Sequence, residues 1–220
     1  TVTKSPGNDI IYGIEEKAGA DVTIIGGLAG DTQKLEGTVF TNNTSGKNGI
    51  LCLVLDKDKI EVKGLAVSGW KPLGTVKKVT KSEGLWIHTI DDQPAMDVVE
   101  KYTGNLTLDS NETNKIVKLN STYPLQVNRQ ESGQTMIPTL FLNKETRAVM
   151  CGQQVPAGTT FRFSLPPDFD VIDTVVESSR SVKENNFPEA DALLIFSCVG
   201  RLESLGPMIS EELQGLARTW

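Results

Sequence analysis

The chain has 220 residues, of which 38% are hydrophobic and 23% charged, and its formal net charge at pH 7 is −6. This length and composition are typical of a globular protein with a sizeable buried core. The acidic balance argues against non-specific binding to nucleic acid or to an anionic membrane surface, and no apolar run approaches the ~20 residues of a membrane-spanning helix. We therefore expect a cytoplasmic protein with neither nucleic-acid nor membrane partners.

The first half of the chain predicts one helix followed by short strands. The helix covers residues 9–17, with Asn8 as its N-terminal cap and Gly19 as its C-terminal stop. Short apolar runs bounded by turn residues then predict strands over residues 22–25, 38–41, 50–56, 60–68, 76–81 and 85–90. The turn at residues 56–59 makes an antiparallel hairpin of the strands on either side of it.

The second half begins with the clearest helix start in the chain. Asp91 and Asp92 suit the positive end of a helix dipole, Pro94 suits the first helical position, and Gly104 ends the helix. Residues 105–121 are polar and predict a loop. Strands are predicted over residues 135–142, 147–151, 159–164 and 192–198, and helices over residues 169–183 and 207–218. This irregular alternation favours an α/β fold with a mixed sheet and α+β character.

The stretch from Ala190 to Arg201 suggests a binding site. Its apolar run over residues 192–196 is uninterrupted, so we expect a strand buried on both faces. The run stops on residues that include Cys198, Gly200 and Arg201, and ligand crevices of open α/β sheets form at such strand ends.

Arg201 is the strongest candidate ligand contact in this stretch. Its guanidinium can donate two parallel hydrogen bonds to a carboxylate, and Gly200 lets the backbone approach closely. The structural alternative is that Arg201 pairs with Glu211 or Glu212 of the last helix. Cys198 has the same two interpretations, as a ligand contact or as a small core residue. The odd number of cysteines and their strand-like settings favour buried, reduced thiols over a disulfide framework.

Two further stretches can contribute to a site. The loop that contains Gly26, Gly27 and Gly30 can present backbone N–H groups, and Asp31 can accept a hydrogen bond from an amine. Trp70, in a glycine-flanked turn, can cover an apolar ligand or stack on a cation. The alternatives are a tight structural turn for the glycines and a core position for the tryptophan.

His88 is the only histidine, which excludes a zinc site with several histidine ligands. It is the only conventional nitrogen ligand for haem iron in the chain, although a hydrogen-bonded structural histidine fits the same position. A catalytic dyad of Cys198 and His88 has no local sequence signature, and no other catalytic pattern is evident. We therefore expect no enzymatic activity and no cofactor, with haem bound by His88 as the alternative.

With these residues laid out, the chain resembles a FIST domain along nearly its whole length. The matching stretches are residues 25–31, 39–40, 68–74 and 78–81 in the N-terminal half, and residues 91–95, 123–124, 155–158, 192–201 and 211–212 in the C-terminal half. Each stretch alone is weakly specific, but their order makes the resemblance specific. The resemblance implies a FIST N-terminal region over residues 1–93 and a FIST C-terminal region over residues 94–220, sharing a central crevice.

FIST domains are bacterial sensory modules, and the resemblance carries functional expectations. It implies binding of a small ligand, with an amino acid or a similar carboxylate metabolite as the class, and signal transduction to an output protein such as a histidine kinase or a cyclase. One haem-binding branch implies nitric-oxide sensing as an alternative, and a non-binding structural or docking module is another. The motifs that usually open and close the family are missing at Thr1 and Trp220, so we expect both ends to be truncated.

Overall fold

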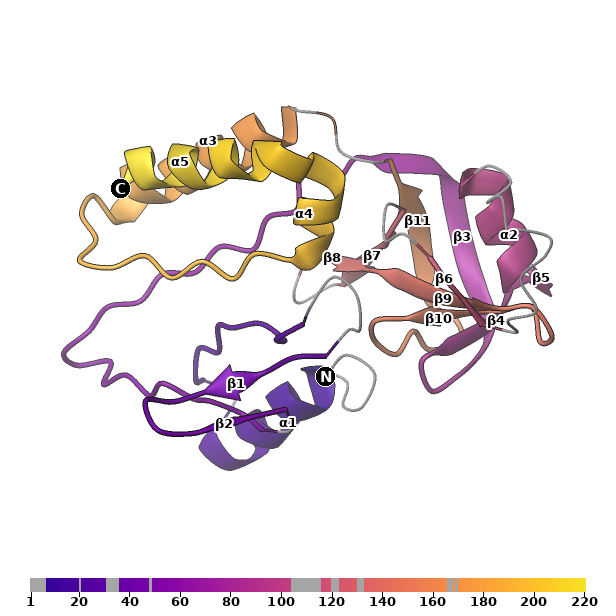
Figure 1. Ribbon diagram of the computed structural model, residues 1–220, viewed down its shortest axis with the longest axis horizontal. Helices are drawn as coiled ribbons and strands as arrows, with labels where there is room; N and C mark the ends of the chain where they lie inside the picture. Colours follow the sequence, from indigo (N-terminus) through magenta and orange to yellow (C-terminus); the bar gives the residue numbers. More distant parts are fainter. Residues whose placement is uncertain are drawn as a thin grey trace. The chain divides into compact units, whose positions relative to one another are not determined.

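The computed structural model describes residues 7–19, 21–30, 36–47, 49–103, 116–119, 123–129, 133–165, 168 and 170–220. The chain divides into two compact units (Figure 1). Unit 1 comprises Thr1–Gly69 with Pro167–Trp220, and unit 2 comprises Trp70–Pro166. Unit 1 therefore joins segments from both ends of the chain, whereas the boundary expected between residues 93 and 94 falls inside unit 2.

Unit 2 is an antiparallel sheet with one helix. Its elements are β3 (Pro72–Glu83), β4 (Trp86–Ile90), β5 (Gln93–Pro94), α2 (Ala95–Thr103), β6 (Ile116–Lys118), β7 (Leu125–Arg129), β8 (Gly133–Ile137), β9 (Thr139–Asn143), β10 (Ala148–Cys151) and β11 (Thr160–Ser164). Among the described residues the strand order is β6-β9-β10-β4-β3-β11-β7-β8, and β5 pairs with β4. The mixed α+β class is thereby confirmed, and the strands predicted at 76–81 and 85–90 are observed as β3 and β4, which pair antiparallel.

The core of unit 2 lies where α2 packs against β4 and β10. Val79 of β3 and Phe163 of β11 are completely buried. The ring of Tyr102, from α2, lies 4.3 Å from that of Phe163, and Phe161 meets Phe163 edge-on at 5.3 Å. These contacts fix α2 against the sheet, because aromatic side chains bury the largest apolar areas.

The predicted helix start at Asp91 and Asp92 is wrong in its details. The helix begins at Ala95, and Pro94 belongs to β5. Asp91 and Asp92 instead form the turn between β4 and β5, with φ angles of 48° and 61°. Aspartate tolerates this left-handed conformation, which two-residue hairpin turns require. The polar stretch at 105–121 is also more structured than expected, since Ile116–Lys118 forms β6; its other residues, apart from Leu119, lie outside the described residues.

Unit 1 consists mainly of helices and extended segments. Its elements are α1 (Gly7–Ala18), β1 (Val39–Phe40), β2 (Ser45–Gly46), α3 (Asp170–Asn186), α4 (Val199–Leu205), a 3-10 turn (Gly206–Met208) and α5 (Ile209–Thr219). The predicted helices at 9–17, 169–183 and 207–218 are confirmed as α1, α3 and α5, and Gly19 ends α1 with φ 95°. The short helix α4 was not predicted.

The predicted buried strand at 192–198 is wrong. These residues run extended without a strand partner, and the side chains of Leu194 and Phe196 are 69% and 57% exposed. Residues 22–25, 50–56 and 60–68 also run without ladder pairs, so the β1–β2 ladder is the only one in the described part of unit 1. The turn at 56–59 does form, with Lys59 N donating to Asp56 O at 3.0 Å. An apolar run indicates that a strand is possible, but only a partner supplies the ladder hydrogen bonds that form it.

The cysteines also depart in part from the expectation of buried thiols. Cys151 is buried in β10, whereas Cys52 and Cys198 are exposed. Both exposed thiols lie in the extended segments of unit 1 that lack strand partners, which explains the difference. In the described residues, no helix combines the length and the apolar character needed to cross a lipid bilayer.

Candidate functional site

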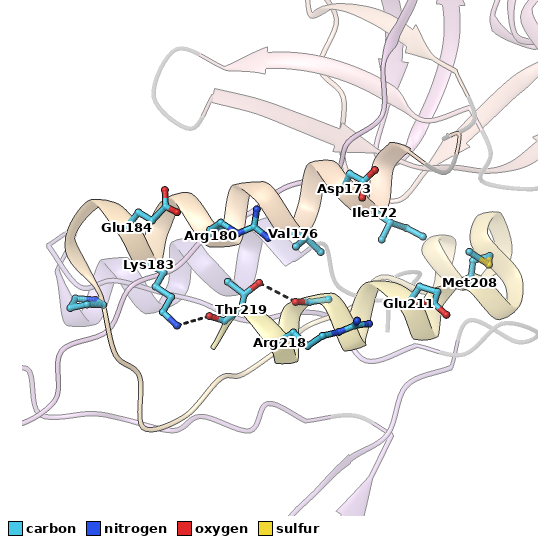
Figure 2. Close-up of a pocket in the computed structure, with 12 residues that line it drawn as sticks. Ile172, Asp173, Val176, Arg180, Lys183, Glu184, Met208, Glu211, Arg218 and Thr219 are labelled. Carbon is cyan, nitrogen blue, oxygen red and sulfur yellow. Dashed lines mark hydrogen bonds between the residues drawn. The ribbon is translucent and has the colours of Figure 1, made fainter.

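Unit 1 has a groove between α3 and α5, with a volume of about 880 Å³ (Figure 2). It is lined by Ile172, Asp173, Val176, Arg180, Lys183, Glu184, Pro188, Met208, Glu211, Gly215, Arg218 and Thr219. Ligand pockets commonly measure about 300–1,000 Å³, so the groove is large enough for a small molecule.

A close contact between Val176 and Gly215 holds the two helices side by side. A Cβ atom added at Gly215 would lie 2.5 Å from Cγ2 of Val176, so only glycine permits this approach. Further along, the Lys183 ammonium donates to the Thr219 carbonyl oxygen at 2.6 Å. Because residue numbers rise together along both helices at these contacts, α3 and α5 run parallel, and their N-termini lie at the same end of the groove.

Charged side chains of both signs line the groove. Asp173 and Glu211 lie toward the end formed by the helix N-termini, Lys183 and Glu184 lie toward the opposite end, and Arg180 lies between them (Figure 2). Asp173 and Lys183 are ten residues apart, which corresponds to about 15 Å along an α-helix. Acidic residues near helix N-termini and basic residues near C-termini also offset the helix dipoles, so this placement stabilises both helices.

Lys183 ties the end of α5 to α3. Besides its hydrogen bond to Thr219, its ammonium lies 5.8 Å from the centre of the Trp220 ring. The indole N–H of Trp220 donates to Ser179 Oγ at 2.8 Å, and its ring meets Phe187 at 6.3 Å. These contacts anchor the end of the groove at the helix C-termini within unit 1.

The two arginines of the groove have different partners. Arg180 forms an ion pair with Glu177 on the same helix. Arg218 donates from Nε to the carbonyl oxygen of Gln214 at 3.3 Å, and within the described residues it has no carboxylate partner. Arg218 is therefore the cation of the groove that is best placed to bind an anionic group of a ligand.

Arg201, the strongest candidate from the sequence, forms a buried ion pair with Glu212. Its Nε donates to Glu212 Oε1 at 2.8 Å, and its Nη2 contacts Oε2 of the same carboxylate. Its Nη1 donates to the carbonyl oxygen of Ser68 at 2.8 Å. The guanidinium thus joins α4, α5 and the segment before Gly69, an arrangement that the sequence offered as the alternative interpretation. A ligand-binding role for Arg201 stays a prediction.

The structure brings some of the other predicted site residues together. Cys198 is the N-cap residue of α4, and Gly200 follows in its first turn. Gly27 lies beside Phe196, since a Cβ atom built on it would be 3.5 Å from Phe196 Cβ. Gly26 and Gly30 belong to the same extended segment as Gly27, and no atom lies within 4 Å of a Cβ built on either.

Of the remaining candidates, Asp31 falls outside the described residues. Trp70 belongs to unit 2, where its carbonyl oxygen accepts from Gln126 Nε2 at 2.7 Å. His88 lies half-buried on β4, between β3 and β10, and does not line the groove. No cluster of three metal-ligating side chains occurs among the residues that the structure describes. Haem binding by His88 stays a prediction.

Comparison with protein families finds two consecutive matches along the chain. Residues 2–93 match the FIST N domain, and residues 95–219 match the FIST C domain. The chain belongs to the FIST family. FIST domains are sensory signal-transduction domains rather than catalytic ones. No curated protein and no solved structure matches this chain.

Sequence reasoning missed the groove of this FIST protein, although both of its helices were predicted. The basic residues near the C-terminal ends of α3 and α5 are visible in the sequence, but such residues usually belong to the solvent-exposed face of a helix. Only the parallel packing through Gly215 places them on one groove.

Proposed function

We propose that this FIST protein is a sensory module that binds a small carboxylate-bearing metabolite, of the amino-acid class, in the groove between α3 and α5. Binding is passed on to a signalling output protein, for which a histidine kinase or a cyclase is the expected class. The observation that carries the proposal is Arg218, which lines the groove without a carboxylate partner in the described part of the chain.

The surroundings of Arg218 favour recognition of a carboxylate. Its guanidinium can donate two parallel hydrogen bonds to the two carboxylate oxygens, which adds geometric specificity to the charge attraction. Lys183 provides a second cation at the same end, and Glu184 provides a carboxylate for a ligand ammonium group. Val176 adds an apolar contact surface to the groove.

Binding of amino acids to the parent protein and to Arg218→Met tests the proposal. Methionine keeps much of the aliphatic length but removes the charge and the hydrogen-bond donors. Arg162→Met is the matched control, because Arg162 is an exposed arginine on β11 of unit 2. A ligand at ~100 times its Kd stabilises the parent by about 2.7 kcal/mol in thermal unfolding.

We expect isothermal titration calorimetry to show about 10- to 100-fold weaker binding by Arg218→Met, since a hydrogen bond to a charged group contributes about 1.5–3 kcal/mol. Arg162→Met should bind like the parent. The proposal fails if no member of the panel stabilises the parent, or if Arg218→Met binds as tightly as the parent does.

A further inference from the structure

We infer that the extended arm of unit 1, residues 49–66, is a dimerisation element that pairs with the same arm of a second copy of this chain. Residues 60–64 of the two copies form an antiparallel strand pair around a two-fold axis at Val62. This surface is separate from the groove between α3 and α5, so the inference does not depend on the ligand of the groove.

The arm is exposed along its whole length, although much of it is apolar. Every residue from 49 to 66 is exposed. Eight large apolar side chains are among them: Ile50, Leu51, Leu53, Val54, Leu55, Ile60, Val62 and Leu65. Complete burial of one aliphatic side chain removes roughly 60–120 Å² of apolar surface from water, so these side chains, each about half exposed, offer roughly 250–500 Å². A protein interface of standard size buries about 800 Å² per partner, of which about 450 Å² is apolar, so the arm supplies an area of this size.

The backbone of the arm can accept another strand. Residues 61–66 run extended, and none of their backbone N–H or C=O groups bonds to another described residue. In the described part of the chain between β2 and β3, no further strand forms (Figure 1). An extended segment with unpaired ladder groups is a template for a strand of another chain, which binds through main-chain hydrogen bonds.

The charge pattern of residues 60–64 indicates a second copy as the partner and sets the register. In an extended chain Glu61 and Lys63 share one face, and Ile60, Val62 and Gly64 share the other. Antiparallel pairing around Val62 places Glu61 of each copy opposite Lys63 of the other copy. An axis at Glu61 or at Lys63 would place like charges opposite each other, and a shift by one residue would place a charge opposite Val62. The segment is therefore complementary to itself in one register.

The apolar face of the segment fits the same register. Gly64 lies against Ile25, since a Cβ atom built on Gly64 would be 2.7 Å from Ile25 Cδ1. Pairing around Val62 places Ile60 of the second copy opposite Gly64, which has no side chain to keep it from Ile25. Ile25 is itself 47% exposed. The side chains of Ile25, Ile60 and Val62 from both copies therefore form one apolar cluster.

The competing explanation is that Glu61 and Lys63 only keep the arm of a monomer in water. Their side chains form an ion pair within the chain at 3.4 Å, and they are 68% and 47% exposed. A pair within one chain has no effect on the association of two chains, whereas the inferred register makes association depend on both signs of charge.

Sedimentation equilibrium of the parent, of Glu61→Lys, of Lys63→Glu and of the double exchange tests the register. We expect the parent to form a dimer and each single exchange to weaken it about 10-fold or more, because like charges then lie opposite each other at two symmetric places. The double exchange restores opposite charges across the axis, so its dissociation constant should return to that of the parent. Both positions are exposed, so the variants should fold like the parent.

Disulfide cross-linking tests the axis. In a background of Cys52→Ser with Cys198→Ser, the variant Val62→Cys places two thiols opposite each other, with Cβ atoms about 4.5–5.5 Å apart. The matched control Leu65→Cys lies on the same arm, but in this register its two copies are six positions apart, or about 20 Å. The oxidant diamide should therefore convert Val62→Cys to a covalent dimer and leave Leu65→Cys as separate chains.

Three results would overturn the inference. The first is a parent protein that sediments as a monomer at every concentration, as expected if the arm closes onto its own chain. The second is a dimer whose dissociation constant is unchanged by both single exchanges. The third is cross-linking of Leu65→Cys as readily as Val62→Cys.

Discussion

Arg201 of α4 and Glu212 of α5 pair in the interior of unit 1, where their side chains are only 9% and 4% exposed. Glu212 is adjacent in sequence to Glu211, which lines the groove. The ion pair therefore holds the helix that forms one wall of the groove. The Arg201 guanidinium therefore supports this wall of the groove, although it does not itself line the groove.

Removing one member of this pair should destabilise unit 1 strongly. Arg201→Met leaves Glu212 buried without its partner, which typically costs about 3–5 kcal/mol. The double variant Arg201→Met with Glu212→Met should recover much of the loss, because no uncompensated charge remains. Urea unfolding followed by Trp220 emission, with Trp70 and Trp86 replaced by phenylalanine, measures the free energy of unfolding of this unit. Equal stability of the single variant and the parent would show that the pair is not formed.

The contact between α3 and α5 should depend on the absence of a side chain at Gly215. The added methyl group of Gly215→Ala would meet Val176 at 2.5 Å, so the helices must separate, at a cost of about 1–3 kcal/mol. Val176→Ala removes the clashing methyl groups, so the double variant should regain part of this stability. A double-mutant cycle of unfolding free energies measures the coupling, and simple additivity would contradict the close packing.

The turn between β4 and β5 should make unit 2 sensitive to acid. The Lys78 backbone N–H, 2.9 Å from Asp91, and next the Lys77 ammonium lower the pKa of Asp91. A carboxyl group with a lowered pKa stabilises the fold at neutral pH, and this contribution is lost as the pH falls through its folded-state pKa. The contribution should be below about 1 kcal/mol, because the pair is partly exposed to solvent.

Asp91→Asn is the matched variant for this effect, since asparagine also tolerates the positive φ angle and keeps an acceptor oxygen. Urea unfolding of unit 2 between pH 7 and pH 3 should show a smaller pH dependence in the variant. The pKa of Lys77 is raised by its hydrogen bond to Asp91, so the parent should also lose stability as the pH rises above about 10.4. Identical pH profiles would refute the role of Asp91.

The three thiols should react at very different rates. Burial raises the pKa of the Cys151 thiol to about 12, so it stays protonated and shielded at neutral pH. Cys52 and Cys198 are exposed. Native protein treated with a thiol-specific reagent should be labelled at Cys52 and Cys198 within minutes and at Cys151 only after unfolding, as peptide mass analysis can show. Labelling of Cys151 in the native state would place it outside the core.

The contrast between Asp91 and the stretch at 192–196 shows how far local patterns can be trusted. At Asp91 the pattern predicted a helix start, and a helix does begin nearby, at Ala95, but the Asp91 carboxylate accepts from the Lys78 backbone N–H of β3 instead of serving the helix. At 192–196 the apolar run indicated a central strand, yet these residues remain extended and exposed. A run of apolar residues defines a preference for burial, but it carries no information about which segment will lie beside it.

By itself the sequence determined the family, the mixed class and the main helices, because caps, turn residues and apolar periodicity act over a few neighbouring positions. Tertiary structure alone decided that Arg201 pairs with Glu212, and that α3 and α5 lie parallel through Gly215. These relationships join residues distant in the chain. Their energies depend on burial and on exact approach distances, which no local pattern encodes.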